Sequence, residues 1–404
     1  MNKENEWREK KVSLGGAIIS AAVTLAIGII VGIYWDNISA TFLPYLGFKK
    51  VATTDWSELN EVYSELSSYY DGEINKQELI EGAKKGMTEA LGDPYTTYYT
   101  AKEAVEFNKN LHGDVGAGIG VEMAKREDYI RVVRTLPDNP ARKAGILAGD
   151  IIYKVDGEEV WDKDIEVISS LIRGESGTEV KVSVVRDGKE LEFTMTREII
   201  NNVSYYINYD DTIAIITVTR FDTDTGTAIQ REAAEFSKKG IDKIILDLRN
   251  NGGGYVDAAN DLLSLWLDGE KTMIEKSKNA LDSYEYASRG KATLKDMKTV
   301  VLVNNQTVSA SEITAVALKE YNKATIVGET TYGKGVTQIL RNLSNGTMIK
   351  ITNSHWYSPL GNSINGYGII PDVEWTNTYE DINAGRDPQM DTAKKILYNQ
   401  MYYD

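Results

Sequence analysis

Residues 243–254 read Lys-Ile-Ile-Leu-Asp-Leu-Arg-Asn-Asn-Gly-Gly-Gly. The apolar run over 243–248 has the length and branched side chains of a buried strand, and the glycines after it end that strand in a turn. Outward from this stretch, apolar periodicity predicts helices over 255–267 and 310–321 and strands over 299–304 and 324–327. Strands that alternate with helices favour βαβ crossovers and a largely parallel sheet. We therefore predict an α/β fold with its site at the carboxyl ends of the strands.

A β-rich segment precedes this core, over residues 113–200. It contains Gly118-Ile119-Gly120-Val121 and then residues 140–157, which read Pro-Ala-Arg-Lys-Ala-Gly-Ile-Leu-Ala-Gly-Asp-Ile-Ile-Tyr-Lys-Val-Asp-Gly. Together these motifs resemble a PDZ domain. Backbone N–H groups at such glycines can converge on a terminal carboxylate, and an extended peptide can then add as a strand to the sheet edge. Alone, the Gly-Ile-Gly triplet would indicate only a turn.

The composition excludes several classes of function. The chain has 404 residues, 60 acidic against 45 basic side chains and a formal net charge of −15, which argues against general binding to nucleic acid. It has no cysteine, so disulfides, thiol catalysis and cysteine–zinc sites are excluded. Its only histidines are His112 and His355, which limits any mechanism built on imidazole.

An uncharged apolar stretch runs over residues 12–35. At about 1.5 Å per helical residue it is long enough to cross a bilayer core of roughly 30 Å, and it is longer than the apolar part of a signal peptide. A buried core helix, the other alternative, would usually show a polar face. Arg8, Lys10 and Lys11 precede the stretch and Asp36 follows it. The positive-inside rule then predicts a cytoplasmic amino terminus and an extracytoplasmic position for the chain after Asp36.

Three segments of the predicted core carry reactive side chains: residues 247–254, residues 309–312 (Ser-Ala-Ser-Glu) and residues 328–338. Each has a structural alternative. Ser309 and Glu312 fit a capping box, the glycines fit a strand-to-helix connection, and Lys334 fits a solvated loop charge. Residues 328–334 also approach a nucleotide-binding P-loop, but Gly335 stands where that motif needs Ser or Thr, and the sequence after it is strand-like.

Taken jointly, the three segments indicate a serine nucleophile with a lysine base. A hydroxyl needs a neighbouring base to attack an amide, and neither histidine lies in a convincing setting. Burial can lower the pKa of Lys334 enough to keep its amine neutral, and Gln338 can hold that amine without charging it. The N–H of Ala310 at a helix start and a glycine N–H from Gly253 or Gly254 would form an oxyanion hole.

The chain resembles the carboxyl-terminal processing peptidases, serine proteases with a PDZ domain inside a crotonase-like catalytic domain. The resemblance runs from about residue 56 to the end and includes residues 92–98 (Gly-Asp-Pro-Tyr-Thr-Thr-Tyr), residues 357–361 and residues 368–372 in addition to the motifs above. It places the family's catalytic Ser, Lys and Gln on Ser309, Lys334 and Gln338, and its oxyanion glycine on Gly254. Val308 and Leu360 depart from the family's usual residues, and the chain lacks the peptidoglycan-binding extension of some relatives.

The resemblance implies a membrane-anchored serine endopeptidase that cuts proteins near their carboxyl termini. It implies that residues 118–121 hold the apolar C-terminal tail of a protein substrate, that the enzyme needs no cofactor or metal, and, by analogy, that it forms a homodimer. The alternative is a membrane-tethered PDZ adaptor with an inactive protease domain. The expected parts are a cytoplasmic tail and transmembrane helix (1–35), a linker (36–55), a helical region (56–100), the PDZ domain (101–200), the protease domain (201–376) and a helical tail (377–404).

Overall fold

The computed structural model describes residues 14–33, 55–126, 129–278, 283–378, 380, 381, 384 and 386–399. The chain divides into two compact units, Met1–Leu79 and Ile80–Asp404. The first unit contains helix α1 (Leu14–Ile33), helix α3 (Ser57–Tyr69) and the start of helix α4 (Lys76–Glu89). We expected a helical region over 56–100. Within it α3 and α4 are separate helices, because Asp71-Gly72 ends the first and Asn75 caps the second with its side chain, and a short strand follows them.

Helix α1 falls inside the stretch predicted to span a membrane. Within the part of the chain that the structure describes, no helix is both long and apolar enough for such a span. The predicted transmembrane helix over 12–35 is therefore not confirmed. The flanking charges that set its predicted orientation, Arg8, Lys10, Lys11 and Asp36, lie outside the described residues.

In the second unit, helix α5 (Ala101–Leu111) precedes the β-rich segment, and Thr100 is its N-cap. The β-rich segment that follows folds as an antiparallel six-stranded sheet of order β3-β4-β5-β7-β8, with β6 beside β5, and a separate β2–β9 pair. The β-rich character expected of this segment is confirmed: residues 130–133 and 180–184 lie inside β4 and β7, and a turn at Asp187-Gly188 joins β7 to β8. Its elements are β2 (Ala117–Gly118), β3 (Val121–Arg126), β4 (Tyr129–Thr135), α6 (Pro140–Ala144), β5 (Ile151–Val155), β6 (Glu158–Glu159), α7 (Ile165–Ile172), β7 (Glu179–Arg186), β8 (Lys189–Thr196) and β9 (Glu198–Ile199).

The core of the second unit is a six-stranded sheet of order β10-β11-β12-β15-β16-β19. Only β10 is antiparallel to its neighbour, so the predicted parallel sheet is confirmed. Alternate residues of its central strands face opposite layers: Ile244 and Leu246 pack into the core that contains α8, α9 and α10, whereas Ile245 packs with α12. The elements are β10 (Tyr205–Asp210), β11 (Ile213–Val218), α8 (Thr225–Ala233), η2 (Ser237–Lys239), β12 (Lys243–Asp247), α9 (Val256–Leu263), β15 (Lys298–Val303), α10 (Ala310–Glu320), β16 (Thr325–Gly328), β19 (Val373–Glu374) and α12 (Pro388–Leu397).

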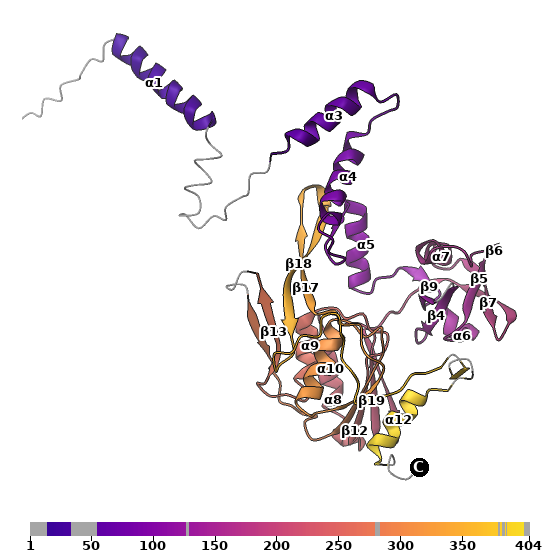
Figure 1. Cartoon of the computed structure of the whole chain (residues 1–404). Coiled ribbons are helices and arrows are strands. Elements are labelled where there is room, and N and C mark those ends of the chain that lie inside the picture. Colours follow the sequence, from indigo (N-terminus) through magenta and orange to yellow (C-terminus); the bar gives the residue numbers. More distant parts are fainter. Residues whose placement is uncertain are drawn as a thin grey trace, which may run out of the picture. The chain divides into compact units, whose positions relative to one another are not determined.

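A five-stranded antiparallel sheet completes the unit, with order β1-β18-β13-β14 and β17 beside β18 (Figure 1). Its first strand is contributed by the segment that follows α4, so the sequence Gly-Asp-Pro-Tyr before that strand is carried to the sheet that contains Gln338. Lys334 lies just before strand β17 of the same sheet. The strands are β1 (Thr97–Tyr99), β13 (Lys271–Ser277), β14 (Tyr284–Ala287), β17 (Val336–Asn342) and β18 (Met348–Tyr357), with a turn η4 (Ser344–Gly346) between the last two.

A buried ion pair ties the carboxyl-terminal helix to the loop after β12. Arg249 donates through Nε and Nη2 to Asp247, at 2.9 and 2.7 Å, and through Nη1 and Nη2 to Asp387, at 2.8 and 2.9 Å. Asp387 is also the residue that caps α12, because its side chain accepts the N–H of Met390. The guanidinium of Arg249, at the start of the glycine-rich loop, is therefore hydrogen-bonded to a carboxylate on each of two sides.

Arg249→Met should destabilise the protein by about 3–5 kcal/mol, because the buried carboxylate of Asp247 would lose its cationic partner and keep only the hydrogen bond from the backbone N–H of residue 249. Thermal unfolding followed by circular dichroism measures this effect, with Arg231→Met on the exposed face of α8 as the control. Equal melting temperatures for the two variants would contradict the role given to this ion pair.

Candidate active site

Three loops meet at the carboxyl ends of neighbouring parallel strands. They follow β12, β15 and β16, and they contain the glycines 252–254, Ser309 and Lys334 respectively. Hydrogen bonds join the first two loops: Val308 N–H and Ser311 Oγ both donate to the carbonyl of Asn251, at 3.0 and 3.1 Å. The structure therefore brings two of the predicted segments into direct contact.

Ser309 occupies a strained turn between β15 and α10. Its φ of 57° and ψ of −117° are unusual for a residue with a side chain, and such strain concentrates at functional positions. Gly253 lies directly against it, since a Cβ built on Gly253 would be 2.8 Å from Ser309 Cβ and 3.0 Å from the N atom of Ala310. Only glycine leaves room for the serine at this point.

The geometry distinguishes the two candidate oxyanion glycines. The N–H of Gly253 already donates to Asn251 Oδ1 at 2.9 Å. Among the described residues, no hydrogen bond uses the N–H of Gly254 or that of Ala310. Among the described residues these two N–H groups are therefore free to bind another acceptor, and their role as an oxyanion hole stays a prediction.

Glu312 joins the serine loop to the lysine loop. This side chain is fully buried, and its carboxylate accepts hydrogen bonds from Ser309 N at 2.8 Å, Thr331 Oγ1 at 2.6 Å, Gly333 N at 2.6 Å and Lys334 N at 3.0 Å. The bond from Ser309 is the carboxylate half of the predicted capping box. The same carboxylate also positions the backbone of the lysine loop, which the sequence did not indicate.

The side chain of Lys334 is partly buried in this arrangement. Burial and the nearby positive charge of Lys350 lower its pKa, and Glu312 and Asp93 oppose that shift. Its amine lies over the ring of Tyr95, 5.0 Å from the centroid, where the ring attracts the charged form. Burial first, and then a hydrogen bond with Tyr332, raise the pKa of Tyr95 to about 12, so the ring stays neutral.

The predicted contacts of the lysine amine are not made in this structure. Within the described residues, no hydrogen bond joins Lys334 Nζ to Ser309 or to Gln338. Gln338 lies just after a β-bulge in β17, and its Nε2 is buried without a hydrogen-bond partner. The residue after Gly335 begins strand β17 and not a helix, so the nucleotide-binding alternative is wrong.

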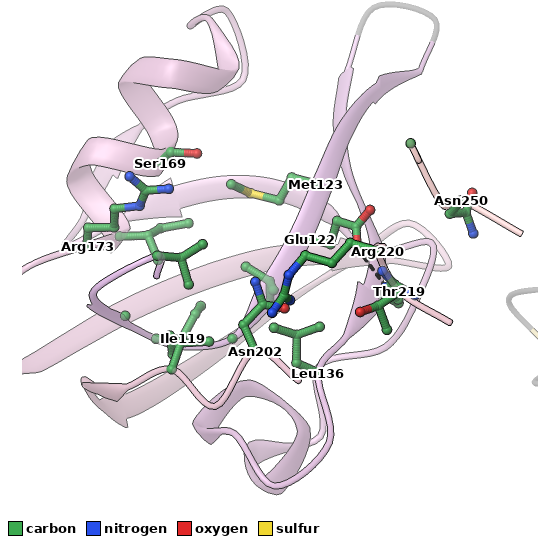
Figure 2. Close-up of a pocket in the computed structure, with 18 residues that line it drawn as sticks. Ile119, Glu122, Met123, Leu136, Ser169, Arg173, Asn202, Thr219, Arg220 and Asn250 are labelled. Atoms are coloured by element: carbon green, nitrogen blue, oxygen red, sulfur yellow. Dashed lines mark hydrogen bonds and ion pairs between the residues drawn. The ribbon is translucent and has the colours of Figure 1, made fainter. Parts of the chain in front are cut away.

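The predicted carboxylate-binding loop lies at a cavity of about 280 Å³ that also reaches the glycine-rich loop. Residues 118–121 line it on one side, and Asn250 and Gly252 line it on the other. Figure 2 shows Ile119 and Leu136 among the residues that line this cavity, with the side chain of Arg220 extending toward Asn202. The loop glycines are needed here, because a Cβ on Gly120 would be 2.3 Å from that of Asn139.

Comparison with known proteins agrees with this arrangement. Residues 212–375 match the model of peptidase family S41, residues 117–196 that of the PDZ domain, and residues 46–103 that of the activating protease CtpB N-terminal domain. The chain is 34% identical over 381 residues to a probable CtpA-like serine protease of Staphylococcus aureus, with 94% of this chain and 74% of that protein covered. A relative with the same description in Staphylococcus haemolyticus is 33% identical over 373 residues, covering 92% and 73%.

The chain belongs to the C-terminal processing peptidases of family S41. It is a serine-type peptidase that carries a PDZ domain. Among solved structures it is similar to the photosystem II D1 C-terminal processing protease, with 26% identity and a TM-score of 0.57 over 82% of this chain and 90% of that one. The fold is also that of an S41 protease of Bacteroides fragilis, with 17% identity and a TM-score of 0.57 over 91% and 97%.

Replacing Lys350 tests the electrostatics of this peptidase. Without the neighbouring positive charge, protonation of Lys334 becomes easier, so its pKa rises and the neutral base exists only at higher pH. The acidic limb of kcat/KM against pH should therefore move to higher pH in Lys350→Met. Lys350→Arg keeps the charge and should leave the limb near its original position. A limb that does not move in Lys350→Met would refute the influence of Lys350.

Glu312→Gln should disrupt both loops at once. A neutral amide has one acceptor oxygen for four donors, so we expect the free energy of unfolding to fall by about 3 kcal/mol and peptidase activity to fall with it. Urea denaturation and hydrolysis of a model protein measure the two effects. Glu235→Gln, at an exposed position, is the control. Full activity in Glu312→Gln would show that the carboxylate does not position the site.

Proposed function

We propose that this peptidase cleaves proteins near their carboxyl termini through a Ser309 acyl-enzyme with Lys334 as the base. The single observation that carries the proposal is the buried Glu312 carboxylate, which ties the turn of Ser309 to the loop of Lys334. We also propose that the protease core has a crotonase-like fold.

The proposed reaction starts from a neutral Lys334. Its amine takes the proton from Ser309 Oγ as that oxygen bonds to the carbonyl carbon of the scissile amide. The carbonyl oxygen becomes negative and accepts hydrogen bonds from the N–H groups of Gly254 and Ala310, each of which contributes about 3–4 kcal/mol to the transition state. The ammonium of Lys334 then returns the proton to the leaving amine. A water molecule, deprotonated by the same amine, releases the second product and restores the serine.

The position of the Lys334 amine indicates which state of the enzyme this structure represents. The amine lies over Tyr95 in this structure, so it must rotate away from the ring before it can bond to Ser309. The four-carbon stem of lysine permits such a movement. Gln338, whose Nε2 has no partner, is suited to receive the moved amine through its carbonyl oxygen. We propose that the described arrangement is a resting state.

Substrate selection is proposed to begin at the PDZ domain. Ile119 is 1% exposed and its carbonyl accepts the N–H of Ala141 at 2.8 Å, which holds the loop 118–121 against helix α6. A C-terminal carboxylate would bind the N–H groups of this loop, and its apolar last side chain would enter the cavity. Membrane attachment through residues 12–35, an extracytoplasmic site and a homodimer stay predictions from the sequence and from the resemblance.

Ser309→Ala and Lys334→Ala should each reduce cleavage of casein at neutral pH by at least about a thousandfold, because each removes a reacting group. The melting temperature should stay close to that of the unmodified protein, and Ser344→Ala, at an exposed position, should cleave normally. Gel electrophoresis of casein digests follows the cleavage.

A wild-type rate in either variant would exclude the Ser/Lys dyad. If instead the unmodified protein fails to cleave casein but binds peptides ending in an apolar residue, measured by fluorescence anisotropy, the tethered PDZ adaptor becomes the better explanation.

A further inference from the structure

One arginine of the cavity comes from the protease core and not from the PDZ domain. Arg220 follows strand β11, which belongs to the parallel sheet, yet it lines the same cavity as residues 118–121. In Figure 2 its side chain extends from beside Thr219 toward Asn202 and the PDZ side of the cavity. A ligand in the cavity would therefore touch both domains.

The guanidinium of Arg220 is only partly used by the protein. Nε and Nη2 donate to the two carboxylate oxygens of Asp222, at 3.0 and 2.6 Å. Nη1 is buried and has no hydrogen-bond partner. A buried N–H group without a partner is costly, so a ligand carbonyl or carboxylate that reached Nη1 would gain a charge-assisted hydrogen bond.

Arg220 also lies where the chain enters and leaves the PDZ domain. On the entering side, a Cβ on Gly113 would be 2.2 Å from the central carbon of the guanidinium, so the two residues are in tight contact. On the leaving side, Asn202 Nδ2 donates to the carbonyl of Gly113 at 3.4 Å, and the N–H of Thr219 donates to the carbonyl of Ser204 at 2.8 Å. A displacement of either connecting segment would therefore shift the side chain of Arg220.

The next residue holds the oxyanion glycines. Phe221 donates its N–H to the carbonyl of Gly253 at 2.9 Å and accepts the N–H of Tyr255 at 2.8 Å. Between these bonds, a Cβ on Gly254 would be 2.2 Å from the Phe221 carbonyl oxygen, so the two backbones are in contact. The position of Gly254 depends on that of Phe221.

We propose that Arg220 is a positioning residue that senses a bound substrate tail and transmits its presence to the oxyanion loop. Nη1 donates to a backbone carbonyl or terminal carboxylate of the tail in the cavity, and the shift of Arg220 moves Phe221, which sets the N–H of Gly254 for the reaction. The ligand is an extended peptide that ends in a free carboxylate. This inference rests on the proposed function and adds to it the residue through which the tail regulates the site.

The test uses the full chain, a short fluorogenic peptide without a tail, and a separate five-residue apolar peptide with a free C-terminal carboxylate. The measured quantity is the ratio of hydrolysis rates with saturating tail peptide and without it, in which a general loss of folding or catalytic capacity cancels. The same tail peptide, fluorescently labelled, gives the dissociation constant by anisotropy. Its C-terminal amide serves as the ligand control, and Arg231→Met as the control variant.

In the unmodified protein and in Arg231→Met, we expect the free-carboxylate peptide to raise the rate and the amide to raise it much less. In Arg220→Met, the ratio should fall to about one even at saturation, and the dissociation constant should rise on the order of tenfold for the lost hydrogen bond. Arg220→Lys keeps a cationic donor and should give an intermediate ratio.

Three outcomes would overturn the inference: a full ratio in Arg220→Met at saturation, an unchanged dissociation constant, or no stimulation of an unmodified enzyme that does hydrolyse the peptide. Failure of the proposed function looks different, because the unmodified protein would then hydrolyse nothing. The dissociation constant would still decide whether Arg220 contacts the tail.

Discussion

The site depends on one carboxylate placed where water cannot reach it. Glu312 is fully buried, and burying a charge is costly unless hydrogen bonds satisfy it. The donors that satisfy it come from the serine turn and from the lysine loop, which leave neighbouring strands of the parallel sheet. The two loops must therefore come together to satisfy the charge. The cost of burial is the reason why the reactive residues share one location.

Around this carboxylate, opposing influences act on the lysine. Burial and Lys350 favour the neutral form of the Lys334 amine, whereas the Tyr95 ring and the carboxylates of Glu312 and Asp93 favour the charged form. The net effect lowers the pKa of Lys334. Small displacements of strand β18, which carries Lys350, or of the turn before β1, which carries Tyr95, would change that balance.

Local patterns in the sequence predict the parallel sheet, the strand of residues 243–248 and the helix that starts after Ser309, because these features follow from apolar spacing and capping within a few residues. They also predict the available N–H of Ala310, since the first turn of a helix leaves such groups free. The position of Tyr95 over the Lys334 amine could not be predicted from local patterns. It requires strand β1 to pair with β18, and the Thr96–Thr352 contact beside it joins residues 256 positions apart. The helical region before this strand is predicted from two runs of apolar spacing, which lie on either side of the break between α3 and α4.

The ion pair of Arg249 with Asp387 has a consequence for the timing of synthesis. Its partners are 138 residues apart, and Asp387 lies near the carboxyl end of the described chain. During translation the glycine-rich loop is synthesised before helix α12, so Arg249 lacks its second carboxylate partner, Asp387, until that helix has been made. A nascent chain therefore holds an unfinished site, and the loop acquires its final support only after helix α12 has been synthesised.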